Sequence, residues 1–176
     1  LPLYPDLDYL NSAAPGVPPT PVFAAGHEGY LRLSQDPDAG KIDYRRYNEE
    51  ITVPELAALI GAQPEEIAIN RNASIGLELV AEGVKTLSAG DEILTTSHER
   101  PVGVNPWRAR AARDGRVLRE VDLPSPVQDA EQLIEPLRAA ITDRTRVLAF
   151  CHVTRGGIRY PIEAMCRLLD YFLSDY

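Results

Sequence analysis

The order of apolar and polar positions along the chain predicts short strands that alternate with helices. Apolar runs of strand length lie at residues 67–69, 92–96, 117–121 and 146–150, each bounded by polar or turn-forming residues. Segments with helical spacing lie at 53–60, 74–87, 101–112, 130–141 and 162–173. Strands alternating with helices of this length favour right-handed β-α-β units. We therefore expect a three-layer α/β fold with a mainly parallel sheet.

The amino-terminal residues do not follow this pattern. Residues 1–26 are rich in proline and carry little periodicity, so we predict an extended arm and linker over 1–40 and a larger domain over 41–176. The helix over 53–60 has Thr52 as a possible cap, Pro54 in its first turn and Gly61 at its end.

The segment 67–80 reads as a short strand, a polar turn and an amphipathic helix. Asn72 or Ser74 can cap this helix, and Ile75, Leu79 and Val80 have the spacing of an inward-facing stripe. Unpaired N–H groups and the helix dipole at such a start form an anion site suited to a phosphate. The alternative is an ordinary cap without a ligand. Neither a Gly-x-Gly-x-x-Gly motif nor a P-loop lysine is present, which disfavours dinucleotide and nucleoside-triphosphate ligands.

Composition narrows the classes of partner. The net charge of -8 argues against nucleic acid or an anionic membrane as a partner. No apolar run reaches transmembrane length. The two cysteines, Cys151 and Cys166, are too few for a disulfide framework and fit a reducing compartment, so we predict a cytoplasmic protein. Cys166 falls within a helical segment and is expected to be buried.

Polar loops follow three of the predicted strands, at 70–74, 97–100 and 151–157. Ligands bind beyond the carboxyl ends of parallel strands, so we expect these loops to converge on one crevice. Neighbours in sequence cannot form a catalytic triad, which argues against a serine hydrolase built on Ser97, His98 and Glu99. A metal site built from His98, Glu99, Cys151 and His152 is a further alternative, but the spacing of these residues matches no zinc pattern. The arginines at 108, 110 and 113 read as a solvated helix face.

Four segments, taken together, resemble a known family. They are Tyr-Leu-Asn-Ser-Ala-Ala-Pro-Gly at 9–16, Asn-Arg-Asn-Ala-Ser at 70–74, Gly-Asp-Glu-Ile-Leu-Thr-Thr-Ser-His-Glu at 90–99, and the stretch from 144 to 162 that contains His-Val-Thr. Their order and spacing resemble the class V aminotransferase family of fold-type I pyridoxal-phosphate enzymes, in the branch of isopenicillin N epimerase-like and cysteine desulfurase-like proteins. The likeness covers about residues 8–167.

The resemblance implies roles for individual residues and pyridoxal 5'-phosphate as cofactor. The turn at 70–74 would hold the cofactor phosphate, the loop at 97–101 would lie over its ring, and the loop after 151 would contact the ring hydroxyl. Relatives usually carry tyrosine or histidine where this chain has Arg100, and His98 is the alternative for the stacking role. The implied residues are Asn72, Ala73, Ser74, His98, Arg100, Thr154 and Arg155 for the cofactor, and Asn11, Ala14 and Gly16 for the substrate.

The resemblance also implies an enzyme that acts on an amino acid by transamination, epimerisation or carbon–sulfur cleavage, as a homodimer or with a complementing chain segment. The family's Schiff-base lysine would follow this stretch, and Lys41 and Lys85 lie in the wrong segments for it. The catalytic residue is therefore unknown, and we expect the amino-terminal part of a fold-type I large domain. One alternative is a non-catalytic fragment or interaction module that retains the fold. Another is a Rossmann-like domain for a different phosphorylated ligand.

Overall fold

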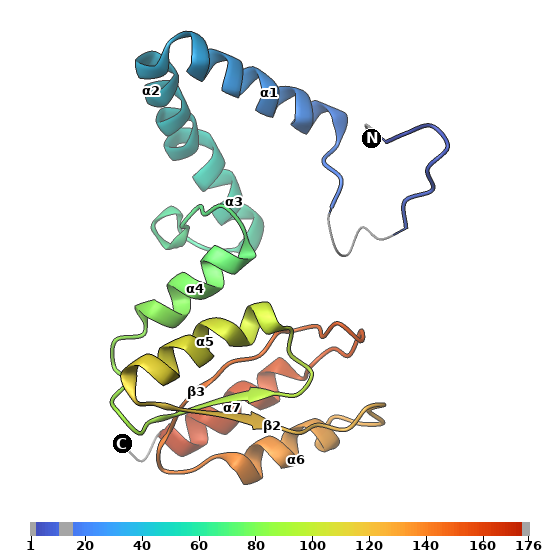
Figure 1. Ribbon diagram of the computed structural model, residues 1–176, viewed down its shortest axis with the longest axis vertical. Coiled ribbons are helices and arrows are strands. Elements are labelled where there is room, and N and C mark those ends of the chain that lie inside the picture. The colour runs from blue at the N-terminus through green and yellow to red at the C-terminus, as the bar shows by residue number, and fades with distance from the viewer. Residues whose placement is uncertain (1–2, 11–15, 174–176) are drawn as a thin grey trace. The chain divides into compact units, whose positions relative to one another are not determined.

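The computed structural model describes residues 3–10 and 16–173. The chain forms two compact units, Leu1–Ile69 and Asn70–Tyr176 (Figure 1). The predicted boundary at residue 40, between an arm and a cofactor-binding part, stays a prediction. No helix formed by the described residues is long and apolar enough to cross a lipid bilayer.

The first unit is helical. It contains α1 (Thr20–Gln35), α2 (Pro37–Tyr47), the π-helical turn η1 (Asn48–Thr52), α3 (Val53–Ile60) and the 3-10 turn η2 (Pro64–Glu66). The expected extended arm is therefore wrong from Thr20 onward. Pro21 is compatible with the first turn of a helix, and no proline follows it until Pro37, so the segment between them is free to be helical.

The ends of two helices in this unit have clear local causes. Asp36 caps α2, because its carboxylate accepts a hydrogen bond from the backbone N–H of Ala39 at 3.0 Å. Gly61 ends α3 in the left-handed conformation with φ 72°, as predicted. Thr52 does not cap α3, because the residues before it are already helical and its side chain makes no cap hydrogen bond.

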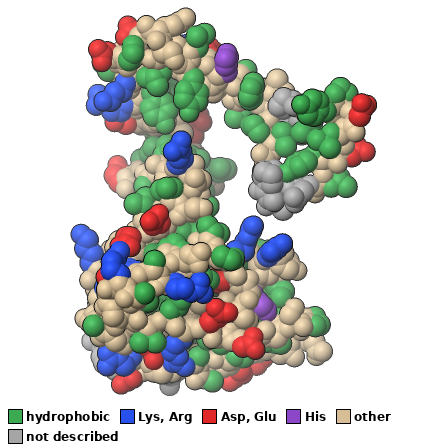
Figure 2. Space-filling model, in the orientation of Figure 1, with side chains coloured by type: hydrophobic (Ala, Val, Ile, Leu, Met, Phe, Trp, Pro, Cys, Tyr) green, Lys and Arg blue, Asp and Glu red, His purple; other side chains and the backbone are tan. Residues whose placement is uncertain are grey.

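The first unit has almost no buried interior. Ala57 is its only buried residue among those described. Large apolar side chains lie at its surface, with Tyr30 75% exposed and Tyr44 67% exposed. Figure 2 shows hydrophobic side chains on the visible surface of its helices. These helices therefore lack a hydrophobic core of their own.

The second unit is an α/β structure. Its elements are α4 (Ala73–Gly83), β1 (Glu92–Thr96), α5 (Pro101–Asp114), β2 (Val117–Val121), α6 (Glu131–Ala140), β3 (Thr145–Leu148) and α7 (Ile162–Leu173). The three strands form a parallel sheet in the order β2-β1-β3, which confirms the predicted fold class. The expected strand at 67–69 is not formed. This short run follows η2 directly and pairs with no strand of the described chain, so its backbone has no ladder to join.

The two faces of the sheet carry separate cores because side chains alternate along each strand. One core joins Ile93 of β1 to Ala81 of α4 and Trp107 of α5. The other joins Val121 of β2 to residues of α6 and α7, including Leu133 and Met165. Figure 1 shows α5 on one side of the sheet and α6 and α7 on the other. The helices therefore cover both faces of the strands.

The one buried residue of helix α4, Ala81, lies near its carboxyl end. Ala81 is 0% exposed, whereas Leu79 is 59% and Val80 is 60% exposed. The prediction that Ile75, Leu79 and Val80 face inward is wrong, because the packed side of the helix passes through Ala81 toward α5. Sequence periodicity identifies an apolar stripe on a helix, but it does not show which face of the helix packs against another element.

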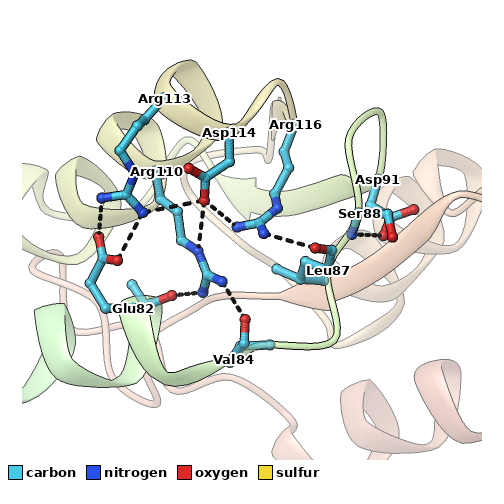
Figure 3. A network of polar contacts seen from close by, with 10 residues as sticks. Glu82, Val84, Leu87, Ser88, Asp91, Arg110, Arg113, Asp114 and Arg116 are labelled. Atoms are coloured by element: carbon cyan, nitrogen blue, oxygen red, sulfur yellow. Dashed lines mark hydrogen bonds and ion pairs between the residues drawn. The ribbon is translucent and has the colours of Figure 1, made fainter.

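Arginines of α5 and the turn after it hold the end of α4 and the segment that follows (Figure 3). Arg110 is 4% exposed, and its guanidinium donates to the carbonyl oxygens of Ala81 and Val84. The same group pairs with Asp114 at 3.5 Å. Nearby, Arg113 binds both carboxylate oxygens of Glu82 at 2.9 and 2.8 Å.

These contacts use groups that a helix end leaves unpaired. The last carbonyls of a helix have no intrahelical partner, and they lie at the negative end of its dipole. A guanidinium satisfies both needs at once, since it carries a positive charge and several donors. The predicted solvated arginine face is therefore wrong at Arg110, although Arg108 and Arg113 are exposed.

Replacing Arg110 by methionine should destabilise the second unit by roughly 3 kcal/mol, because carbonyls at the end of α4 and the Asp114 carboxylate lose their buried partner. Urea unfolding followed by the fluorescence of Trp107, the only tryptophan, measures this unit. The matched control is Arg108→Met on the exposed face of the same helix, expected to change the unfolding free energy by about 0.5 kcal/mol or less. Equal effects of the two variants would contradict the assigned role.

Candidate functional site

Helix α4 begins with an ordered polar cap. The Asn72 backbone is extended, with φ -169° and ψ 170°, and its side-chain oxygen accepts from the N–H of Ile75 at 3.0 Å. The side chain of Asn70 in turn accepts from the N–H of Asn72 at 3.1 Å. Asn72 is therefore the N-cap, while Ser74 lies in the first turn of the helix. Asn70 and Asn72 together therefore order the backbone where α4 begins.

The first turn leaves donors available to an anion. The backbone N–H groups of Ala73 and Ser74 have no acceptor among the described residues, and the Ser74 hydroxyl makes no hydrogen bond with them either. Asn72, Ala73 and Ser74 are all exposed. Three donors at the positive end of a helix dipole, open to solvent, fit a phosphate.

The loop after β1 is joined to the segments after β2 and β3. The backbone N–H of Ser97 donates to the carbonyl of Val121 at 2.9 Å, and its hydroxyl accepts from the N–H of Leu123 at 3.0 Å. The Glu99 carboxylate accepts from the backbone N–H of Cys151 at 2.7 Å. The structure thus brings the loops at 97–100 and 151–157 together at the carboxyl edge of the sheet.

His98 belongs to a hydrogen-bonded group that sequence reasoning missed. The hydroxyl of Tyr160 lies 3.1 Å from His98 Nδ1 and 3.0 Å from Thr96 Oγ1. Burial raises the pKa of Tyr160 to about 12, so its hydroxyl keeps its proton at neutral pH. The other ring nitrogen, His98 Nε2, is buried without a hydrogen-bond partner among the described residues. A buried polar atom left unpaired costs about 1–3 kcal/mol, which a ligand can recover.

Arg100 stands at the start of α5. Its carbonyl oxygen accepts from the N–H groups of Gly103 at 2.8 Å and Val104 at 3.3 Å. Its side chain is exposed and makes no hydrogen bond or ion pair with the rest of the described chain. The guanidinium is therefore free to lie flat against a ligand ring.

Thr154 and Arg155 lie in a tight turn after β3. Thr154 is buried, and its Oγ1 accepts from the N–H of Ile158 at 3.1 Å. Gly157, with φ 81°, closes the turn by donating to the Thr154 carbonyl at 3.0 Å. Arg155 is exposed at the tip. The hydroxyl proton of Thr154 has no acceptor in the part of the chain that the structure describes, so it remains available as a donor.

The predicted site residues are only partly brought together. His98, Arg100, Thr154 and Arg155 come from the two loops that meet at the carboxyl edge. Figure 1 shows α4 beside α5, both beginning on the side where the strands end, so the α4 cap faces the same edge. No hydrogen bond joins the cap to the other loops within residues 70–168. Gly16 is exposed in the first unit, and Asn11 and Ala14 lie outside the described residues.

The two cysteines differ in environment. Burial and the neighbouring Glu99 carboxylate raise the pKa of the Cys151 thiol to about 11. Cys166 is exposed, so the prediction that it is buried is wrong. The packed face of α7 runs through Met165 and Leu168 instead. Among the described residues, no three His, Cys, Asp or Glu side chains are arranged to hold a metal ion.

Comparison with known proteins identifies related sequences. The family model described as aminotransferase class-V matches residues 8–170. A cysteine desulfurase of Cronobacter sakazakii is 31% identical over 163 residues, covering 89% of this chain and 39% of the relative. An isopenicillin N epimerase of Amycolatopsis lactamdurans is 31% identical over 176 residues, covering 93% of this chain and 42% of the relative. The chain thus spans about two fifths of the length of these relatives.

Solved structures share the fold. The cystine C-S lyase C-DES, in complex with its product cysteine persulfide, aligns with a TM-score of 0.75 and 23% identity over 87% of this chain and 40% of that protein. A C-DES mutant with glycine covalently linked to its PLP cofactor aligns with a TM-score of 0.74 and 24% identity over the same shares of the two chains, 87% and 40%. The cysteine desulfurase CsdA of Escherichia coli aligns with a TM-score of 0.71 and 22% identity over 92% of this chain and 41% of that protein. These likenesses confirm the predicted fold-type I arrangement.

Alkylation should distinguish the two thiols. At pH 8 a thiol of pKa about 11 has on the order of a hundredfold less thiolate than an ordinary cysteine, so iodoacetamide should modify exposed Cys166 well before Cys151. Peptide mass spectrometry over time measures both rates. Glu99→Gln keeps an oxygen acceptor for the Cys151 N–H but removes the charge, so it should accelerate alkylation of Cys151. Equal rates at the two cysteines in the folded wild-type chain would contradict the assigned environments.

Proposed function

The chain belongs to the aminotransferase class-V family, and on this premise we propose that it binds pyridoxal 5'-phosphate and contributes to an enzyme that acts on an amino acid. The observation that carries the proposal is the start of α4. There the Asn72 cap leaves the N–H groups of Ala73 and Ser74 without acceptors, at a position where the family resemblance expects the cofactor phosphate.

The remaining residues have roles that follow from their own chemistry. Asn72 orients the first turn, while Ala73 N–H, Ser74 N–H and the Ser74 hydroxyl donate to phosphate oxygens. Arg100 or His98 lies over the ring, and Thr154 donates its free hydroxyl proton to the ring oxygen, with Arg155 beside it. Asn11, Ala14 and Gly16 contact the substrate in this proposal. Their roles come from the family resemblance alone.

When bound, pyridoxal 5'-phosphate acts as an electron sink that stabilises negative charge on the substrate carbon. The residues of this chain hold the phosphate, support the ring and order the loops around it. The related proteins are named for desulfurase, epimerase and C-S lyase activities. We therefore place the reaction among transamination, epimerisation and carbon–sulfur cleavage of an amino acid. The homodimer and the cytoplasmic location remain predictions.

A second candidate is a cofactor-binding module without catalysis of its own. The positions of the two lysines favour it. Lys85 follows the carboxyl end of α4. The 11 residues of this helix rise 1.5 Å each, so its carboxyl end lies about 16 Å from the end that we propose to bind phosphate. Lys41 lies in α2 of the first unit. Reduction with borohydride tests whether Lys41 or Lys85 nevertheless links the cofactor, since only a lysine joined to the cofactor is fixed permanently to the protein. Covalent trapping would contradict the module without catalysis.

Ser74→Asp should weaken binding of pyridoxal 5'-phosphate on the order of tenfold, because it places a negative charge where the phosphate is to lie. The helix itself should not suffer, since aspartate is favourable in a first turn. Fluorescence titration measures the affinity, and circular dichroism measures the helix content.

Two controls sharpen this test. Thr86→Asp adds the same charge at an exposed turn outside α4 and should leave the affinity unchanged. Pyridoxal, which lacks the phosphate, should bind wild type and Ser74→Asp equally. If Ser74→Asp binds the phosphorylated cofactor as tightly as wild type does, the phosphate lies elsewhere and the proposal is wrong.

A further inference from the structure

The sequence contains one Asp-Gly pair, Asp114–Gly115, and no Asn-Gly pair. It stands where α5 ends, with Asp114 as the last helical residue and Gly115 as the C-cap in the left-handed conformation, with φ 68°. An aspartate side chain reacts most readily with the main chain when glycine follows it, because glycine has no side chain to hinder the approach of its nitrogen. This pair is therefore the position of the chain most prone to such a reaction.

The reaction is an isomerisation of the backbone in two steps. The Gly115 nitrogen attacks Asp114 Cγ and loses its proton, and the side-chain hydroxyl leaves as water, which gives a succinimide ring. Water then opens the ring at one of its two carbonyls. Opening at one carbonyl regenerates aspartate, and opening at the other gives isoaspartate, in which the main chain runs through the former side chain. One water is lost and one is gained, so no other reactant is needed.

Three guanidinium groups surround the Asp114 carboxylate, and we call them the arginine cluster (Figure 3). The carboxylate oxygens lie 2.8 Å from Arg113 Nε, 2.9 Å from Arg116 Nη1 and 3.5 Å from Arg110 Nε. The hydrogen bond from Arg113 lowers the pKa of Asp114. An ionised carboxylate has no hydroxyl to release, so the cluster keeps this side chain in its unreactive form.

The folded chain also holds the attacking nitrogen. The N–H of Gly115 donates to the carbonyl of Ala111 and closes the last turn of α5. Ring closure requires this nitrogen to rotate toward Asp114 Cγ, which breaks the hydrogen bond and shortens the helix. The electrophile and the nucleophile are thus both restrained by contacts of the same corner.

We propose that Asp114–Gly115 is a site of spontaneous isoaspartate formation, which the arginine cluster keeps closed while the second unit is folded. The reaction proceeds when this corner opens, because local opening releases the carboxylate and the nitrogen together. Conversion lengthens the main chain by one carbon and shortens the side chain that carries the carboxylate. The anion then no longer lies among the three arginines, so each conversion also weakens the attachment of α4. The inference is independent of the proposed cofactor.

Incubation of the full chain in heavy-oxygen water, at neutral pH and physiological temperature, tests the proposal. Each ring opening adds one heavy oxygen to the peptide that contains residues 114–115, so mass spectrometry counts the conversions, and fragmentation identifies isoaspartate. We expect the folded chain to convert at least about tenfold more slowly than the same chain in guanidinium chloride. Equal rates in the two states would overturn the proposal.

Two variants on α5 test the role of the cluster. Arg113 and Arg108 both have side chains that are 57% exposed, but Arg108 pairs with Asn105 and Glu120 instead of Asp114. Arg113→Gln removes one of the three cations around the carboxylate and should speed conversion on the order of threefold. Arg108→Gln should convert at the wild-type rate. If the two variants convert equally fast, the arginines do not guard the site and the proposal is wrong.

A further variant separates the lost ion pair from a general loosening of the helix contact. Arg113 also binds both carboxylate oxygens of Glu82 on α4. Glu82→Gln removes the charge of that pair but leaves Arg113 beside Asp114, so it should convert at the wild-type rate. An acceleration as large as that of Arg113→Gln would contradict the guarding role. If Arg113→Gln does not fold, the comparison of folded and denatured wild-type chain still decides whether the site is closed.

Discussion

The contact between Arg110 and the end of α4 is the constraint on which the second unit depends. It is a buried cation that satisfies carbonyls no other group of the described chain reaches, and it belongs to the helix that follows β1 directly. Helices are stiff, so fixing the carboxyl end of α4 also fixes the direction of its amino end. The turn that we propose to bind phosphate is therefore oriented by an interaction at the far end of the helix, in addition to the Asn70 and Asn72 hydrogen bonds of the turn itself.

The parts of the fold that sequence reasoning predicted have local causes. Strands β1 and β2 follow from short apolar runs with polar flanks, and helix α5 follows from its leading proline and terminal glycine. Gly61 and Gly115 end helices with positive φ, a conformation that glycine adopts without steric cost. The Asn72 cap was one of two options that the same rules allowed. Such features are decided within a few residues, so the sequence is sufficient to find them.

The features that sequence reasoning missed depend on residues far apart in the chain. Arg110 looks like any other arginine of a polar helix until α4 is folded against α5. Tyr160 has no motif of its own, and its bonds to Thr96 and His98 span more than sixty residues. Leu79 has helical spacing, yet its side chain remains 59% exposed. Partner choice, unlike periodicity, is a property of the assembled structure.

The bond between Glu99 and the backbone of Cys151 joins positions 52 residues apart. Contacts of such separation form late, because the intervening chain must first be ordered at a cost in entropy. During synthesis the loop after β1, which carries the Glu99 acceptor, leaves the ribosome well before the Cys151 N–H donor after β3. The Glu99 side of this hydrogen bond is thus synthesised long before the bond can form. The joining of the two loops at this edge is consequently a late step in the folding of the nascent chain, because it requires β3 and the segment after it.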